Sequence, residues 1–250
     1  MADVTKTAIV TAAGRGIGAA CARKLAAQGW KVVLMSPSKS CQDLARELGG
    51  WAHSGSVMEP SDLAAIVQLA LDKTGRIDGV VANTGHGPGG MKNPGGPIVG
   101  PDAQGRLLDI EDADWHVGLD MYLLYVIRLL RLVTPVMERQ GGGAIVSISS
   151  VNALEPRPRF PMSIMRMALH GFTKLYSDRY GRAGIRINNV LPGFVENLPV
   201  PDEAIQLIPM KRKIKLSDVA GTVAFLLSDE AGGITGLNVP VDGGFLRGVR

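Results

Sequence analysis

Several residue types are scarce in this sequence, and each scarcity excludes a class of protein. The 250 residues include two cysteines, Cys21 and Cys41, with no CxxC pair and no histidine cluster. A metal site or a disulfide framework is therefore not expected. The net charge is only +4 and the basic residues are scattered, so no arginine and lysine stripe supports a nucleic-acid partner.

Long uninterrupted apolar runs are also absent. The most apolar stretch, residues 121–137, contains Arg128 and Arg131, so we interpret it as a buried helix rather than a membrane span. The chain begins "MADVTKTAIVTAAG", which lacks the basic-then-apolar layout of a secretion signal. We therefore expect a cytoplasmic protein in a reducing compartment, without a membrane partner.

What is present is a regular alternation of short apolar runs and amphipathic helical stretches. The expected strands are 7–10, 32–35, 51–53, 79–82, 144–149, 186–191 and 238–241. The expected helices are 17–28, 41–48, one from 61, 114–137, one within 160–174 and 217–227. This alternation predicts a single α/β domain over 1–250, with a doubly wound parallel sheet of Rossmann type and helices on both faces.

Two finer expectations concern individual helices. Ser61 is expected to cap the helix after the third strand, because serine favours that position. The stretch "FPMSIMRMALHGFTK" is expected to bury one apolar face, formed by Ile164, Met167, Ala168 and Phe172 at helical spacing.

One segment, 85–113, breaks the alternation. It begins "GHGPGGMKNPGGPIVGPDAQ", where the glycines and prolines oppose both helix and strand. It follows the carboxyl end of the fourth strand, the edge where ligands bind in open α/β sheets. It is therefore either a substrate-shaping loop near the active-site edge or a surface insertion.

The turn "TAAGRGIG" (11–18) directly follows the first strand and opens the first helix. Gly14, Gly16 and Gly18 allow a sharp turn and a close approach of the backbone to a pyrophosphate. The helix N-terminus then offers free N–H groups to that phosphate. The strand, turn and helix context predicts a dinucleotide site.

Five motifs in this order resemble those of the short-chain dehydrogenase/reductase family. The glycine-rich turn resembles the pattern TGxxxGxG, with Ala12 in place of the first glycine. The other four are "VANTG" (81–85), "IVSISS" (145–150), "GIRINNVLPGFVEN" (184–197) and "ITGLNVPVDGG" (234–244). The resemblance covers essentially the whole chain and, within the family, is to members like the 3-oxoacyl-acyl-carrier-protein (3-oxoacyl-ACP) reductases.

The resemblance implies a seven-stranded sheet and an oxidoreductase that moves a hydride between NAD(P)(H) and a small alcohol or carbonyl substrate. Family members are usually homotetramers or homodimers, so either state is implied, or a hetero-oligomer with an active homologue. Carried over position by position, the cofactor-binding residues are Thr11, Gly14, Arg15, Gly16, Ile17, Gly18, Ser36, Ser56, Asn83, Gly85, Arg166, Pro192, Gly193 and Asn197.

The position that selects between the two dinucleotides is Ser36, at the end of the second strand. A carboxylate there would select NAD, and serine does not repel a 2′-phosphate. Arg15 and Lys39 could attract that phosphate, so the sequence favours NADP(H) over NAD(H). Ser56 stands where the family has an aspartate near adenine, which suggests a weakened contact.

The catalytic positions are mostly substituted. In the family a tyrosine transfers the proton, a lysine one turn later supports it, a serine holds the carbonyl oxygen, and an asparagine supports a relay water. The matching positions here are Met162 for tyrosine, Arg166 for lysine and Tyr122 for asparagine. Only the serine persists, as Ser149 or Ser150.

These substitutions have direct chemical consequences. Met162 has no ionisable proton, and Arg166 stays protonated, although it could bind ribose hydroxyls or a substrate carboxylate. Losing a positioned proton donor costs roughly 10²–10⁴-fold in rate. Tyr122 could supply the proton, with the Arg166 charge favouring its ionised form; the alternative is that Tyr122 only packs beside Met162.

Three functions therefore stay open. The first is an oxidoreductase with an altered proton-donor arrangement and weak activity. The second is a catalytically silent subunit that serves as an oligomer partner or a ligand-binding regulator. The third is non-redox chemistry that uses Arg166 with Ser149 or Ser150.

Overall fold

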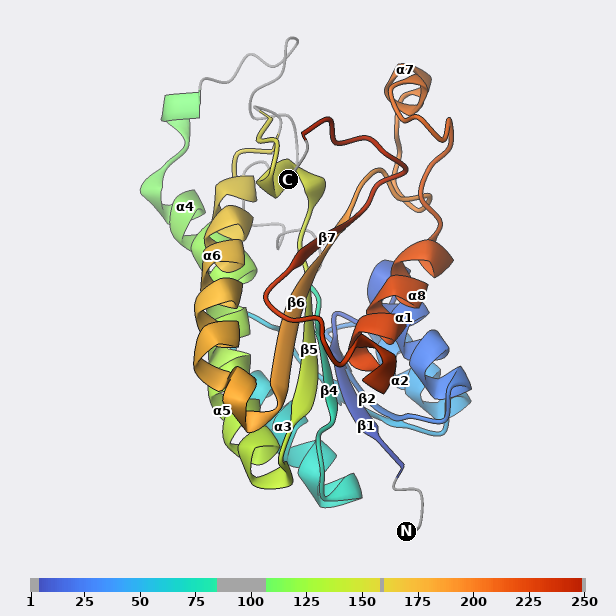
Figure 1. Ribbon diagram of the computed structural model, residues 1–250, viewed down its shortest axis with the longest axis vertical. Coiled ribbons are helices and arrows are strands. Elements are labelled where there is room, and N and C mark those ends of the chain that lie inside the picture. Colours follow the sequence, from blue (N-terminus) through green and yellow to red (C-terminus); the bar gives the residue numbers. More distant parts are fainter. Residues whose placement is uncertain (1–4, 85–106, 158–159, 249–250) are drawn as a thin grey trace.

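Seven parallel strands form one sheet in the order β3-β2-β1-β4-β5-β6-β7 (Figure 1). The computed structural model describes residues 5–84, 107–157 and 160–248. The strands are β1 (Thr7–Thr11), β2 (Lys31–Ser36), β3 (Trp51–Ser54), β4 (Gly79–Ala82), β5 (Gly143–Ile148), β6 (Ile185–Pro192) and β7 (Asn238–Val241). The predicted Rossmann-type fold is confirmed, because the order reverses between β1 and β4 as in doubly wound sheets.

Helices cover both faces of the sheet. They are α1 (Gly16–Ala27), α2 (Lys39–Glu47), α3 (Pro60–Thr74), α4 (Asp112–Leu119), α5 (Tyr125–Gln140), α6 (Ser163–Tyr180), α7 (Asp202–Gln206) and α8 (Leu216–Leu227). One core lies under α1, α2 and α8, and the other lies under α3, α5 and α6 (Figure 1). Within the described ranges, no helix combines the length and apolar character that a membrane crossing requires.

Both cysteines lie in the first of these cores, Cys21 on α1 and Cys41 on α2, and both are free. Burial raises the pKa of the Cys21 thiol to about 12 and that of Cys41 to about 11. The two thiols therefore stay protonated and act as small apolar side chains.

The structure corrects two local expectations. Helix α3 begins at Pro60 with Glu59 as its N-cap, so Ser61 is not the cap; proline suits the first helical position because the N–H it lacks would be unpaired there. The expected apolar face of α6 was also wrong, since Ile164 and Met167 are each 46% exposed. The helix instead turns a face with polar residues inward.

The inward face of α6 explains that second correction. Leu169, Thr173 and Tyr176 are buried, and the Tyr176 hydroxyl lies 2.6 Å from Thr134 Oγ1 on α5. The Thr173 hydroxyl donates to the Asn189 side chain of β6. Because these polar groups find partners, they can be buried, and apolar spacing alone cannot identify the buried face.

The long helix predicted over 114–137 contains a π-helical turn, Asp120–Leu124, between α4 and α5. Such turns insert one residue into the helical repeat and occur often at functional sites. The segment 85–113 mostly lies outside the described residues; its end forms a short 3₁₀ turn, Leu107–Asp109, and begins α4.

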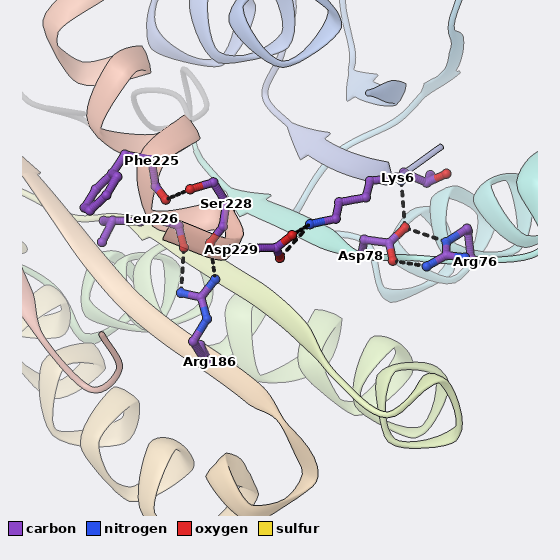
Figure 2. Close-up of polar contacts among 9 residues, drawn as sticks. Lys6, Arg76, Asp78, Arg186, Phe225, Leu226, Ser228 and Asp229 are labelled. Atoms are coloured by element: carbon purple, nitrogen blue, oxygen red, sulfur yellow. Dashed lines mark hydrogen bonds and ion pairs between the residues drawn. The ribbon is translucent and has the colours of Figure 1, made fainter. Parts of the chain in front are cut away.

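Hydrogen bonds and ion pairs connect the elements at the amino edge of the sheet (Figure 2). Arg186 of β6 donates to the carbonyls of Leu226 and Ser228 at 2.7 and 2.9 Å, which satisfies the C-terminal end of α8. Lys6 pairs with Asp229 at 2.6 Å. Because these donors already have partners within the protein, the functional site is expected at the carboxyl edge.

The glycine-rich turn contains a strained alanine. Ala12 has a φ of 48°, in the left-handed region where a Cβ costs about 1–2 kcal/mol. Ala12→Gly should therefore raise the free energy of unfolding by about 0.5–1 kcal/mol, after the entropy cost of glycine is subtracted, as measured by urea denaturation. The control Ala13→Gly, at a buried neighbour without positive φ, should lower it; equal losses in both variants would contradict the strain.

Candidate active site

The glycine-rich turn leaves the N-terminus of α1 open to a ligand. Arg15, the N-cap of α1, makes no side-chain capping hydrogen bond, and its side chain is exposed. Ile17 in the first turn packs partly against the core below. The first N–H groups of the helix and the positive end of its dipole thus remain available to an anion at the carboxyl edge.

The glycines of this turn form a cradle that side chains would fill. A Cβ on Gly14 would lie 2.8 Å from the Ser36 hydroxyl, and one on Gly18 would lie 2.9 Å from Asn83 Nδ2. Gly16 has a φ of 56°, and a Cβ there would lie 2.9 Å from Asn197 Nδ2. The three glycines are therefore required by close packing within the turn, and this compact turn before the uncapped N-terminus of α1 fits a dinucleotide.

Three serine hydroxyls lie beside the cradle. Ser36 Oγ and Ser38 Oγ are 2.9 Å apart, and Ser38 Oγ and Ser40 Oγ are 2.7 Å apart. Ser36 is the predicted selector position, whereas Ser38 and Ser40 were missed, although their alternate spacing in "SPSKS" was a usable signal. Lys39 lies within this cluster in the sequence, and Arg15 follows Gly14, which packs against the three serines; both cations are exposed.

The carboxylate of Asp62 on α3 binds the loop that follows β3. Ser56 Oγ accepts from Met58 N at 3.1 Å, and the backbone N–H of Ser56 donates to Asp62 Oδ2 at 2.8 Å. The side chain of His53 also bonds Asp62, and these two contacts lower the pKa of Asp62. The sequence analysis found only Ser56 here, because Asp62 comes from the first turn of α3.

Asn83 joins β4 to the glycine-rich turn. Its side-chain N–H donates to the Ala12 carbonyl at 3.3 Å, and the Thr11 hydroxyl donates to its carbonyl at 2.5 Å. Gly85 lies outside the described residues. Pro192 ends β6, and Gly193 N donates to the Val241 carbonyl at 3.0 Å, which fixes the turn that follows.

Met162, at the tyrosine position, lies in an apolar cluster. It is the N-cap of α6 and is 7% exposed. Its sulfur packs against Gly118 of α4, where an added Cβ would come within 2.5 Å of it. The other members of the cluster are Ile110, Trp115, Val117 and Tyr122. A thioether in such surroundings neither donates nor accepts a catalytic proton.

Arg166, at the lysine position, connects β5 to the π-helical turn. Its Nη1 donates to the Ile148 carbonyl at 2.7 Å. Its guanidinium carbon lies 4.3 Å from the centroid of the Tyr122 ring, a cation–π contact. The structure therefore brings together Arg166 and Tyr122, as the hypothesis of a substitute proton donor requires.

The two candidate serines have different partners. Ser149 Oγ lies 2.7 Å from His170 Nε2 of α6, and both residues are buried. Ser150 is half-buried, and its Oγ accepts from Asn152 N at 3.2 Å. His170 was missed because a lone helical histidine gives no signal of its partner. Ser150 is the more accessible of the two hydroxyls.

A second phenol, Tyr125, lies one turn beyond Tyr122 on α5. It is 1% exposed, and burial raises its pKa strongly, although the Arg166 charge opposes this rise. The sequence analysis did not single it out. Because its phenol is buried and hard to ionise, Tyr125 does not supply a proton near neutral pH.

The carboxyl edge thus carries the glycine-rich turn together with a cluster in which Met162 and Tyr122 pack near Arg166. Among the described residues, no group of three or more histidine, cysteine, aspartate or glutamate side chains could hold a metal ion. Gly85 aside, the predicted site residues gather in turns and helix starts at this edge.

Comparisons with known proteins agree with this architecture. A family model described as "Enoyl-(Acyl carrier protein) reductase" matches residues 11–246. The chain is 31% identical to "Dehydrogenase/reductase SDR family member 4" of Oryctolagus cuniculus, over 96% of this chain and 93% of that protein. It is 32% identical to "3-oxoacyl-[acyl-carrier-protein] reductase" of Synechocystis sp., over 96% of this chain and 97% of that protein.

A solved structure has the same fold. The crystal structure of levodione reductase superposes with a TM-score of 0.83 and 26% sequence identity, covering 97% of this chain and 98% of that chain. The similarity therefore extends over the whole sheet and its helices.

Proposed function

The chain belongs to the short-chain dehydrogenase/reductase family, and on that premise we propose that it is an NADP(H)-dependent oxidoreductase of small alcohols or carbonyl compounds. Its proton transfer is altered and its turnover is slow. The observation that carries the proposal is the compact turn of Gly14, Gly16 and Gly18, which leads into α1 without a side-chain cap. The similarity to a 3-oxoacyl-[acyl-carrier-protein] reductase and to levodione reductase supports this reaction class.

Different residues at the carboxyl edge have separate roles in this reaction. The bound dinucleotide supplies the hydride that reduces the carbonyl carbon. Ser150 donates a hydrogen bond to the substrate oxygen, because its hydroxyl is half-buried whereas Ser149 is occupied by His170. Such a bond stabilises the negative charge that develops on that oxygen.

Tyr122 transfers the proton to the same oxygen. It is the accessible phenol of the site, since Tyr125 is buried. The guanidinium of Arg166 lies over its ring, 4.3 Å from the centroid, and this contact holds the phenol beside the end of β5. The slow rate follows from the buried thioether of Met162 at the family's tyrosine position.

The serine cluster supports NADP(H) rather than NAD(H). Ser36, Ser38 and Ser40 present hydroxyl groups where a carboxylate would repel a 2′-phosphate. Lys39, between Ser38 and Ser40, and Arg15, in the glycine-rich turn, are both exposed. Hydrogen bonds from hydroxyls together with such charges suit a phosphate dianion.

A second candidate function is a catalytically silent subunit that retains cofactor binding. The specific observation in its favour is the packing of Met162 with Ile110, Trp115 and Val117. If Tyr122 only completes this apolar cluster, the site has no proton donor. Such a subunit would serve as an oligomer partner or as a ligand-dependent regulator.

Exposed apolar groups on α5 and α6 support a homodimer or a homotetramer built from it. Leu175 is 71% exposed, and it lines a shallow groove between the two helices with Ile127 and Phe172. Glu138 lies in the same groove as Arg131 and Arg179, so two copies related by a two-fold axis can pair opposite charges.

The cofactor preference is tested by titration of NADPH and NADH while nicotinamide fluorescence is followed. We expect NADPH to bind about tenfold more tightly, a difference of one charge-assisted hydrogen bond. Ser36→Asp should reverse the preference, because its carboxylate repels the 2′-phosphate. The control Ser61→Asp, on the exposed start of α3, should leave both affinities unchanged; equal affinities in the unaltered protein would contradict the assignment.

The role of Tyr122 is tested with a set of carbonyl substrates. Tyr122→Phe should lower kcat by about 10²-fold, the effect of removing a proton-transfer group, with NADPH affinity unchanged. Tyr180→Phe, at the far end of α6, is the matched control. An unchanged kcat in Tyr122→Phe means that this phenol only packs. Gain of activity in Met162→Tyr with Arg166→Lys would then support the silent subunit as a degenerate enzyme.

The proposed dimer is tested by analytical ultracentrifugation. Leu175→Glu should convert the assembly to a smaller species, because a carboxylate would be buried in the interface without a partner. Leu207→Glu is the control, since Leu207 is 56% exposed but lies next to α7. A monomeric mass for the unaltered protein would refute the dimer outright.

A further inference from the structure

Arg166 carries a charge that no carboxylate of the described residues neutralises. Its contacts are the Ile148 carbonyl, 2.7 Å from Nη1, and the Tyr122 ring, 4.3 Å from Cζ. The carboxylate of Asp120 at the start of the π-helical turn is bound to Arg128 at 2.7 Å. The guanidinium is half-buried, and a partly desolvated charge without a counterion is costly.

The geometry of the guanidinium leaves donors for a ligand. Arginine has five N–H groups in one plane, and the Ile148 bond uses only Nη1. The cation–π contact with Tyr122 involves the face of that ring and does not consume an N–H group. The remaining N–H groups match the two oxygens of a carboxylate.

The surroundings of this cation are apolar on one side. Tyr122, which Arg166 contacts, belongs to the same cluster as Met162, Trp115 and Val117. Met162 is buried in this cluster, whereas Trp115, Val117 and Tyr122 are partly exposed, so a ligand bound at Arg166 would contact these three side chains. Such a wall favours a ligand with an apolar body and a single anionic group.

From this arrangement we infer that the substrate is an apolar oxo acid whose carboxylate is bound by Arg166. The inference rests on the proposed function and specifies its substrate class. In the reaction, a hydride from NADPH forms the new C–H bond, the C=O π bond breaks, and a proton completes the hydroxyl. NADPH becomes NADP⁺, and the carboxylate is unchanged.

The test compares an acid with its neutral analogue. The probes are 4-phenyl-2-oxobutanoate and its methyl ester, titrated by calorimetry into the full chain with and without NADP⁺, which blocks turnover. The unaltered protein should bind the acid about tenfold more tightly than the ester, as expected for one charge-assisted contact. Added salt should weaken binding of the acid and leave binding of the ester unchanged. Equal affinities would overturn the inference.

Variants locate the preference. Arg166→Met should bring the affinities of acid and ester to within about twofold, a difference below 0.5 kcal/mol, whereas Arg182→Met, an exposed arginine beyond α6, should preserve the full ratio. Arg166→Lys keeps the charge without the planar fork and should retain part of the preference. If Arg166→Met does not fold, Arg166→Lys and the salt series still test whether Arg166 binds the carboxylate.

Cofactor binding is measured separately in the same variants by nicotinamide fluorescence. If Arg166→Met weakens NADPH binding and keeps the preference for the acid, the arginine binds the cofactor and the inference fails. If the acid preference depends on Arg166 but NADPH does not bind at all, the carboxylate site stands and the oxidoreductase proposal falls.

Discussion

The hydrogen bond from Arg166 to the Ile148 carbonyl joins the elements that build the catalytic half of the site. It connects α6 to the carboxyl end of β5, and the contact with Tyr122 adds the π-helical turn. A lysine at this position would be a flexible point charge, whereas the planar guanidinium can donate to a carbonyl and cover a ring at the same time. Met162, Tyr122 and Arg166 therefore belong to one packed arrangement.

The two halves of the carboxyl edge, the glycine-rich turn and the region around Arg166, differ in the side chains that they carry. The cradle of Gly14, Gly16 and Gly18 admits no side chain, and Asn83 ties it to β4. The other half presents the buried thioether of Met162 and the guanidinium of Arg166. The closely packed glycine-rich turn before the uncapped start of α1 suits the NAD(P) binding that the family suggests.

The fold was predictable from the sequence because apolar runs and glycine turns alternate throughout the chain, and β4 was located to the residue at Gly79–Ala82. The assignment of Met162 and Arg166 to the family's tyrosine and lysine positions rests on motif spacing and stays a prediction. Partners in space were not: His170 beside Ser149 and Asp62 beside Ser56 come from other elements. The buried face of α6 was misassigned because Thr173 and Tyr176 are buried through hydrogen bonds that periodicity cannot register.

The burial of the two thiols has a practical consequence for measuring this molecule. Cys21 and Cys41 lie on α1 and α2, the helices that follow the glycine-rich turn and the serine cluster. An alkylating reagent reaches them only when this part of the chain opens, so the rate of thiol labelling reports the frequency of that opening. A nucleotide bound at the glycine-rich turn should slow labelling in proportion to its occupancy. The labelling rate of the two thiols therefore measures ligand binding without any need for turnover.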